Sequence, residues 1–275
     1  MIRVGAILLA VAALGLSGCD GVDQLRREFV ALRYMQDAET DLQSLPRLSG
    51  RAERAVDRAL ALLPEDEQLQ RRAARLYAIA GAWEKAIALF EADPELGPQD
   101  RSSYAMSLLG AGETEHGARL CLELIQSARK GREQNRIGLR EWALLLNDAG
   151  YILADNELHL DTAYQAVVDA TGAFPLEAAF IDSVGWALYR KGQPKDAAFH
   201  LERARRMSPR EDPEMLYHLG VVYGRLGRYG DASEVLMLAH ELAPDSEEIL
   251  KELQRQRRIM PPLALVQAPA PQLQF

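Results

Sequence analysis

A periodicity of 34 to 35 residues constrains the fold of this 275-residue chain more than any other feature of its sequence. In the second half of the chain, glycine and proline each recur at that spacing. The glycines are Gly150, Gly185 and Gly220, and the prolines are Pro175, Pro209 and Pro244. Such a period is typical of repeat proteins, in which each unit is one supersecondary motif that buries its apolar face against the next unit. We therefore expect a linear array of units instead of a single central core.

Each unit is expected to contain two helices. Ala and Leu together supply 83 residues and Thr only four, a composition that favours helix over sheet. In the last unit, Gly220 leaves room for a neighbouring helix, and Gly227 permits the turn that ends the first helix. Ala232 and Ala239 are seven residues apart and lie on one face of the second helix, which Pro244 ends.

This unit resembles the tetratricopeptide repeat, a helix–turn–helix motif of about 34 residues. The resemblance is carried in the last unit, 213–244, by Leu219, Gly220, Tyr223, Gly227, Ala232, Leu236, Ala239 and Pro244. It recurs in 178–209 and, with one extra residue in the turn, in 143–175, while three looser upstream copies bring the total to six helix pairs. The resemblance implies an all-α fold, a right-handed superhelical solenoid of such repeats.

The chain divides into several predicted parts. In order they are a signal peptide in 1–18, a lipidated cysteine with a lead-in helix in 19–45, the repeat array in 46–258 with a capping helix in 246–258, and a Pro-rich flexible tail in 259–275. Ser246 is the predicted N-cap of the capping helix, whose polar surface suits the end of an array. The polar stretch 130–139 is either a loop between repeats or the extended start of a helix.

The N-terminal sequence resembles that of a bacterial lipoprotein. Arg3 precedes an uncharged stretch, Val4 to Leu16, which as a helix would be about 20 Å long and too short for a membrane core of about 30 Å. The sequence Leu16-Ser17-Gly18-Cys19 then matches a lipobox, which implies cleavage after Gly18 and acylation of Cys19. The alternative is an ordinary signal peptide followed by a chance cysteine.

Acylation would make this a membrane-anchored protein of the bacterial cell envelope that faces the periplasm, because two or three acyl chains suffice for stable anchoring. Asp20 favours retention in the inner membrane of enteric bacteria, and the choice between inner and outer membrane stays open. The processed chain would have 257 residues and a formal charge of −9, since Arg3 is removed. We expect so acidic a body to stay off anionic headgroups and leave the anchoring to the acyl chains.

Charge and cysteine content exclude several classes of function. A formal net charge of −8 argues against a nucleic-acid binder, which needs a basic surface. Two cysteines are too few for a disulfide scaffold or a four-cysteine zinc site, and Cys121 falls where the repeat has a packed residue, which predicts a buried thiol. No HExxH, GxSxG, phosphate-loop or GxGxxG motif occurs. We therefore expect no enzymatic activity, cofactor, metal or small-molecule substrate.

The resemblance also implies which residues face a partner, because the first helices of such repeats form a concave groove. The matching positions of the three best repeats hold Asn147, Asp148, Tyr151, Asp155, Asp182, Ser183, Trp186, Tyr189, Arg190, Tyr217, His218 and Arg225. Aromatic rings beside polar groups suit an extended peptide, although Trp186 and Tyr189 alternatively only pack between adjacent repeats. In the second repeat, Arg71, Arg72 and Arg75 suit either an acidic partner segment or a solvated helix face.

The leading interpretation is an adaptor or scaffold, anchored by Cys19, that binds protein or peptide partners through this groove, in envelope assembly or secretion. The second is a self-associating structural scaffold whose copies join through the tail or through acidic faces. The third, an envelope enzyme of unusual form, has no sequence motif in its favour. The sequence names neither the partner nor the pathway.

Overall fold

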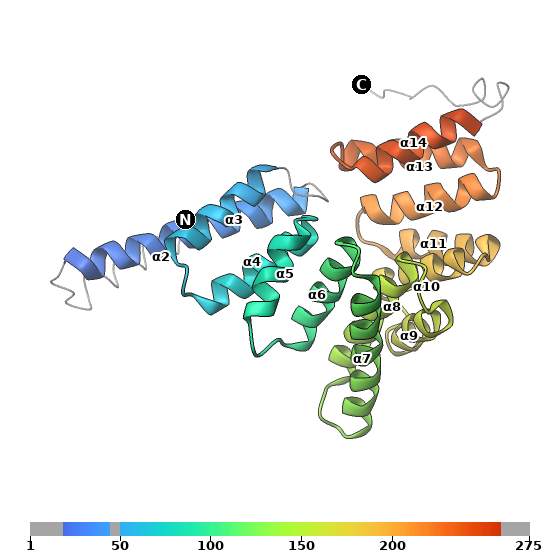
Figure 1. Cartoon of the computed structure of the whole chain (residues 1–275). Coiled ribbons are helices and arrows are strands. Elements are labelled where there is room, and N and C mark those ends of the chain that lie inside the picture. Colours follow the sequence, from blue (N-terminus) through green and yellow to red (C-terminus); the bar gives the residue numbers. More distant parts are fainter. Residues whose placement is uncertain (1–18, 45–49, 260–275) are drawn as a thin grey trace.

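The computed structural model describes residues 19–44 and 50–259, and 81% of these residues are helical, in 13 helices without a strand (Figure 1). The prediction of an all-α fold is confirmed. In chain order the helices are α2 (Cys19–Ser44), α3 (Gly50–Leu62), α4 (Glu67–Ile79), α5 (Trp83–Ala92), α6 (Pro98–Gly110), α7 (Thr114–Glu133), α8 (Leu139–Asp155), α9 (Leu160–Ala173), α10 (Ala178–Arg190), α11 (Pro194–Met207), α12 (Pro213–Arg225), α13 (Tyr229–Leu242) and α14 (Glu247–Ile259).

Successive helices pack as hairpins, from α2 with α3 to α12 with α13, and α14 covers the end of the last hairpin. The first helices of neighbouring hairpins also contact each other in series, from α2 and α4 to α12 and α14. The helices therefore follow one another along an arc, with α2 and α14 towards its two ends (Figure 1). Stacking of this kind places corresponding residues of successive first helices side by side.

Two helix boundaries differ from the sequence expectation. The helix expected as a lead-in over 19–45 is α2, which packs along α3 as the first helix of the first hairpin. The stretch 130–139 is divided, because α7 continues to Glu133 and α8 begins at Leu139. The first helix of the repeat expected from 143 therefore begins four residues earlier.

Several predicted segments lie outside the described residues. They are the signal peptide with the first three lipobox residues, in 1–18, and the Pro-rich tail from 260 onwards. Within 19–44 and 50–259, no helix has both the length and the apolar character that a membrane span requires.

The glycines act as the repeat pattern predicts. A Cβ atom on Gly220 would lie 2.3 Å from Leu236 Cγ, so only glycine permits α12 and α13 to approach this closely. Gly227 has a φ of 76° and Gly192 a φ of 78°, the left-handed conformation that ends a first helix and begins the turn. Both predicted roles, close approach and turn, are confirmed.

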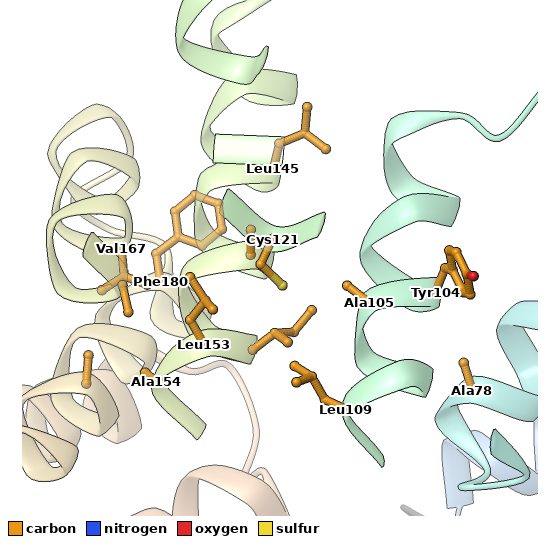
Figure 2. Close-up of a cluster of buried hydrophobic side chains, with 14 of the residues drawn as sticks. Ala78, Tyr104, Ala105, Leu109, Cys121, Leu145, Leu153, Ala154, Val167 and Phe180 are labelled. Atoms are coloured by element: carbon orange, nitrogen blue, oxygen red, sulfur yellow. The ribbon is translucent and has the colours of Figure 1, made fainter. Parts of the chain in front are cut away.

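Apolar side chains form a continuous core between the hairpins. Figure 2 shows Cys121 of α7 in this core, near Ala105 and Leu109 of α6. Burial raises the pKa of the Cys121 thiol to about 12, so the thiol is protonated at neutral pH. The prediction of a buried thiol at this position is confirmed.

The last helix begins as predicted. The Ser246 hydroxyl accepts a hydrogen bond from the backbone N–H of Ile249 at 3.4 Å. Ile249 and Leu253 of α14 are buried against the last hairpin, while Glu247 and Arg257 face solvent. An apolar inner face with a polar outer face suits the terminal helix of an array.

Candidate partner-binding site

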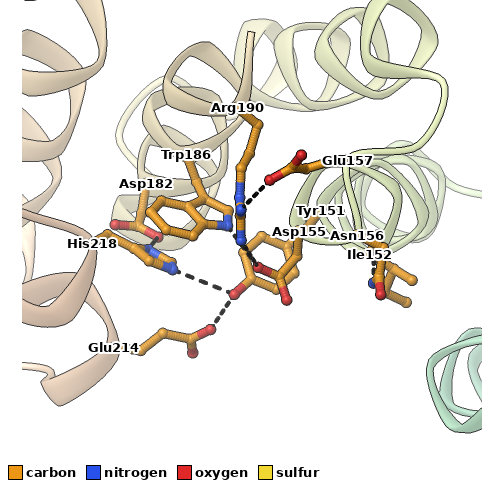
Figure 3. Close-up of polar contacts among 10 residues, drawn as sticks. All are labelled: Tyr151, Ile152, Asp155, Asn156, Glu157, Asp182, Trp186, Arg190, Glu214 and His218. Atoms are coloured by element: carbon orange, nitrogen blue, oxygen red, sulfur yellow. Dashed lines mark hydrogen bonds and ion pairs between the residues drawn. The ribbon is translucent and has the colours of Figure 1, made fainter. Parts of the chain in front are cut away.

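The predicted groove residues of three repeats meet in one polar cluster. They come from the first helices α8, α10 and α12, and α10 contacts both of the other two. Figure 3 shows side chains from the three helices converging, among them Tyr151, Trp186 and His218. We call the set the first-helix cluster, which comprises the predicted residues Tyr151, Asp155, Asp182, Trp186, Tyr189, Arg190, Tyr217 and His218 together with Glu214, which the repeat pattern does not predict.

Trp186 is the centre of the first-helix cluster. Its indole N–H donates to Asp155 Oδ1 of α8 at 2.9 Å. Its ring stacks on the imidazole of His218 of α12, with 4.0 Å between centroids and 20° between planes. Trp186 is only 2% exposed, so it packs between repeats. The structure thus favours, for this ring, the packing alternative over direct contact with a partner.

Asp182 and His218 form a buried pair between α10 and α12, with 2.7 Å between Asp182 Oδ2 and His218 Nδ1. Burial alone would lower the pKa of His218, but the nearby carboxylates of Asp182, Glu214 and Asp155 raise it above its ordinary value. The carboxylates around the ring therefore favour its protonated form more than water does. The contact between Asp182 and His218 joins two neighbouring first helices.

Tyr151 connects α8 directly to α12, past the intervening α10. Its hydroxyl donates to the Glu214 carboxylate and lies 3.5 Å from His218 Nε2. Glu214 is accessible to solvent, yet the protein atoms around its carboxyl raise the pKa of that carboxyl. Through these contacts Tyr151 links two first helices that are not neighbours in the array.

Arg190 covers the outer edge of Trp186. Its guanidinium lies 4.6 Å from the centroid of the indole, within range of a cation–π interaction. It also donates to Asp155 at 3.0 Å and to Glu157 at 2.7 Å. The ring of Tyr189 stacks on that of Trp186, with 5.1 Å between the two ring centroids. These contacts hold a cation and an aromatic ring in place at the surface.

The structure separates the predicted groove residues by exposure. The buried ones are Asn147, Asp182, Ser183, Trp186 and His218. The half-buried ones are Asp148, Tyr151, Tyr189, Arg190 and Tyr217, and the exposed ones are Asp155 and Arg225. A partner reaches only the second and third groups without rearrangement of the helices. Their role in binding stays a prediction.

Two neighbours of this surface were not predicted. Glu214 lies in the first turn of α12, outside the positions taken from the repeat pattern, and the local signals for that turn are the Asp212 N-cap and Pro213 at the first helical position. Glu252 of α14 lies close enough to Tyr217 to help burial raise the pKa of that tyrosine to about 12. Arg255 pairs with Glu252 at 2.6 Å. The surface therefore extends onto the capping helix.

The second predicted surface, the arginines of α4, is not a free basic patch. Each guanidinium has a carboxylate partner on another helix or turn, in the pairs Arg71–Asp93, Arg72–Glu39 and Arg75–Asp100. The contact between Arg75 and Asp100 is 2.7 Å long and joins α4 to α6. These side chains link neighbouring repeats, a use that neither sequence alternative included.

Other described surfaces hold no stronger candidate. Two open clefts of about 520 and 600 Å³ lie where the end of α7 extends past α9, and their linings share no residue with the first-helix cluster. Across 19–44 and 50–259, no group of three or more His, Cys, Asp and Glu side chains is arranged to hold a metal ion.

Comparison with protein families gives a match in the best of the predicted repeats. Residues 185–247 match the family described as Tetratricopeptide repeat. A stretch of 78 residues is 37% identical to the TPR repeat-containing protein PA4667 of Pseudomonas aeruginosa, and it covers 28% of this chain. The chain spans only 13% of the length of that relative.

Solved structures extend the likeness to most of the chain. A thermophilic TPR protein of Thermus thermophilus, TTC0263, has a TM-score of 0.54 at 21% identity over 70% of this chain and all of its own. PilW, described as a widely conserved type IV pilus biogenesis factor, has a TM-score of 0.52 at 16% identity over 84% of this chain and 98% of its own. At these identities the likeness shows the fold alone, a TPR solenoid.

Proposed function

We propose that this protein is a lipid-anchored adaptor of the bacterial cell envelope, which faces the periplasm and binds protein partners on the face formed by α8, α10 and α12. The observation that carries the proposal is the arrangement of three half-buried tyrosines, Tyr151, Tyr189 and Tyr217, around the buried Trp186. Aromatic rings on a rigid base supply contact area with little loss of side-chain entropy.

Binding without catalysis is supported by the fold, because TPR proteins are generally non-enzymatic scaffolds. The polar groups around the tyrosines also suit a peptide backbone, since Asp155 and Arg225 are exposed at the same face. The anchor is supported by the lipobox alone, which ends at Cys19. Envelope assembly and secretion are the processes in which an anchored adaptor of this kind would act.

The binding face is tested with a double variant, Tyr217→Ala/Arg225→Ala, in pull-downs from detergent-solubilised membranes followed by quantitative mass spectrometry. Trp186 is left intact because it is buried and its removal would disturb the packing of three helices. The matched control is Tyr229→Ala/Arg206→Ala, which removes the same residue types from the second helices α13 and α11. We expect partner recovery to fall at least about fivefold in the first variant only. Equal recovery by both variants and the wild type would overturn the assignment of this face.

The anchor is tested separately, by the intact mass of the protein isolated from bacterial membranes. We expect a chain that lacks residues 1–18 and carries acyl groups on Cys19, and we expect a Cys19→Ser variant to carry none. An unmodified Cys19 in the wild-type chain would refute the anchor and leave the binding face untouched.

A further inference from the structure

The first half of α2 has no partner helix. As helices, the 26 residues of α2 extend over about 39 Å and the 13 residues of α3 over about 20 Å. The hairpin therefore covers only the second half of α2, where Ala31, Met35 and Ala38 are buried. No side chain from Gly21 to Val30 is buried, and Figure 1 shows this half projecting beyond the rest of the array.

An apolar stripe runs along the first half of α2. It consists of residues spaced by three and four positions, which lie on one helix face: Val22, Leu25 and Phe29. At about 100° per residue, this face is opposite the buried Ala31, whereas the next apolar residue, Leu32, lines a cleft with residues of α4 and so faces the array. Val22 is 46% exposed, although it is a large apolar side chain, and Leu25 and Phe29 are half-buried.

We propose that this stripe lies in the interface of a lipid membrane, with α2 parallel to the bilayer surface. The inference rests on the proposed acylation of Cys19. Because Cys19 is the first residue of α2, its acyl chains would hold the bilayer within one helical turn of Val22. A helix confined at that distance needs little affinity of its own to stay on the membrane.

The charges beside the stripe suit the same surface. Arg26 and Arg33 are exposed and lie next to the apolar residues on the helix, where they reach anionic headgroups. From the sequence we expected the acyl chains alone to hold this acidic protein to the membrane. The proposal adds a second contact, through α2. The body would be held with its first helix flat on the bilayer.

A second copy of the chain is the competing occupant, because the same three residues also fit the seam of a coiled coil. The stripe covers little more than one heptad, however, and helix pairs of that length are marginal in water. A membrane surface at the first residue of the helix is available to every anchored molecule at any concentration. The lipid surface is therefore the occupant that the geometry favours.

The test measures the reactivity of single introduced cysteines in the acylated protein, reconstituted in vesicles of phosphatidylethanolamine and phosphatidylglycerol. Val22→Cys places the probe in the stripe, and Gln24→Cys, two residues further along, places the control on the opposite side of the helix at a similar distance from the anchor. Both positions are exposed in the structure, and the native Cys121 is buried, so background labelling by a water-soluble maleimide is low. We expect Val22→Cys to react about tenfold more slowly than Gln24→Cys.

The outcomes separate the alternatives. Slow reaction of Val22→Cys that persists after about a hundredfold dilution of the protein in lipid supports membrane contact. Slow reaction that disappears on dilution indicates a second copy and overturns the proposal. Reaction of Val22→Cys that is as fast as that of Gln24→Cys, or faster, means that the stripe does not contact the bilayer, which overturns the proposal while the anchor holds. An unacylated Cys19 in the intact mass overturns both.

Discussion

At the scale of single residues, Gly220 shows how little space the helix hairpins leave. A Cβ atom there would meet Leu236 Cγ at 2.3 Å, and the fixed path of α13 leaves this side chain little room to move. We expect Gly220→Ala to lower the free energy of unfolding by about 1–3 kcal/mol, as for other overpacked sites, in urea titrations. Gly230→Ala is the control, because its Cβ would meet nothing within 4 Å. A loss of the same size at Gly230 would contradict the explanation by close approach.

The Asp182–His218 pair predicts a dependence of stability on pH. The pKa of His218 in the folded protein is raised above its ordinary value near 6.5, so the pair stabilises the fold fully below that value. The stabilisation is lost as the pH rises through the folded pKa, because the unfolded chain releases the proton first. The free energy of unfolding of the wild-type protein should therefore fall as the pH rises from 6, because the contribution of the Asp182–His218 pair is lost.

The variant Asp182→Asn isolates the contribution of this pair to stability. It keeps the shape of the side chain and removes the carboxylate that contributes most to raising the pKa of His218. We expect the difference in unfolding free energy between wild type and variant to be largest near pH 6 and to shrink towards pH 9, in urea titrations at several pH values. A difference that is constant over this range would show that the pair does not ionise as described.

At the scale of elements, one of the described turns between paired helices differs from the others in its residue types. In the turn from α8 to α9, Glu157 and His159 adopt left-handed φ values of 57° and 46°, a conformation that Gly192 and Gly227 adopt in the next two hairpins. Left-handed backbone costs a residue with a Cβ atom about 1 kcal/mol relative to glycine. The turn with the extra residue is therefore expected to lower the free energy of unfolding relative to a turn that has glycine at its left-handed position.

Exchanging the residue types at these turns tests that cost. We expect His159→Gly to raise the free energy of unfolding by about 0.5–1 kcal/mol, and Gly192→Ala to lower it by about 1–2 kcal/mol. Thermal and urea unfolding of the two variants would measure both changes. The prediction fails if His159→Gly destabilises the protein, since glycine relieves strain only where the left-handed conformation is present in solution.

The helix hairpins themselves could be predicted from the sequence, because glycine, alanine and proline recur at fixed positions with a local physical role. The length of α7 could not, since Gly131 and the polar residues beside it suit the end of a helix as well as its continuation, and α7 runs past them to Glu133. The sequence also named most of the first-helix cluster, through the repeat positions. It did not show which members are buried, because exposure there depends on how far each first helix rotates against the next.

The contact between Tyr151 and Glu214 illustrates this limit. The two residues are 63 positions apart and lie on helices separated by α10. Their contact depends on the superhelical twist over three repeats, which a 34-residue period does not specify. Trp186 is a similar case, since an aromatic residue at a groove position is equally compatible with exposure and with burial between repeats.

At the scale of the whole molecule, most helix contacts join neighbours along the array, and the contact of Tyr151 with Glu214 reaches one repeat further. Each hairpin packs on the next, and α2 and α14 at the two ends do not contact each other in the described structure. In such proteins stability is approximately a sum of unit and interface contributions, so a local defect is expected to spread only as far as the adjoining units. The capping helix α14 therefore protects the last hairpin more than it protects the first.

Leu253→Asp tests this locality, because it places a charge in the buried face of α14. We expect amide hydrogen exchange to accelerate at least about tenfold in α12, α13 and α14, while α2 to α7 keep their wild-type rates. The physical reason is that undocking α14 exposes apolar side chains of the last hairpin only, and the distant interfaces retain all their contacts. A control variant on the exposed face of the same helix, Lys251→Ala, should leave every helix unchanged. Uniform acceleration across all helices in Leu253→Asp would instead show that the array unfolds as one cooperative unit, and the binding face on α8, α10 and α12 would then depend on the cap for its stability.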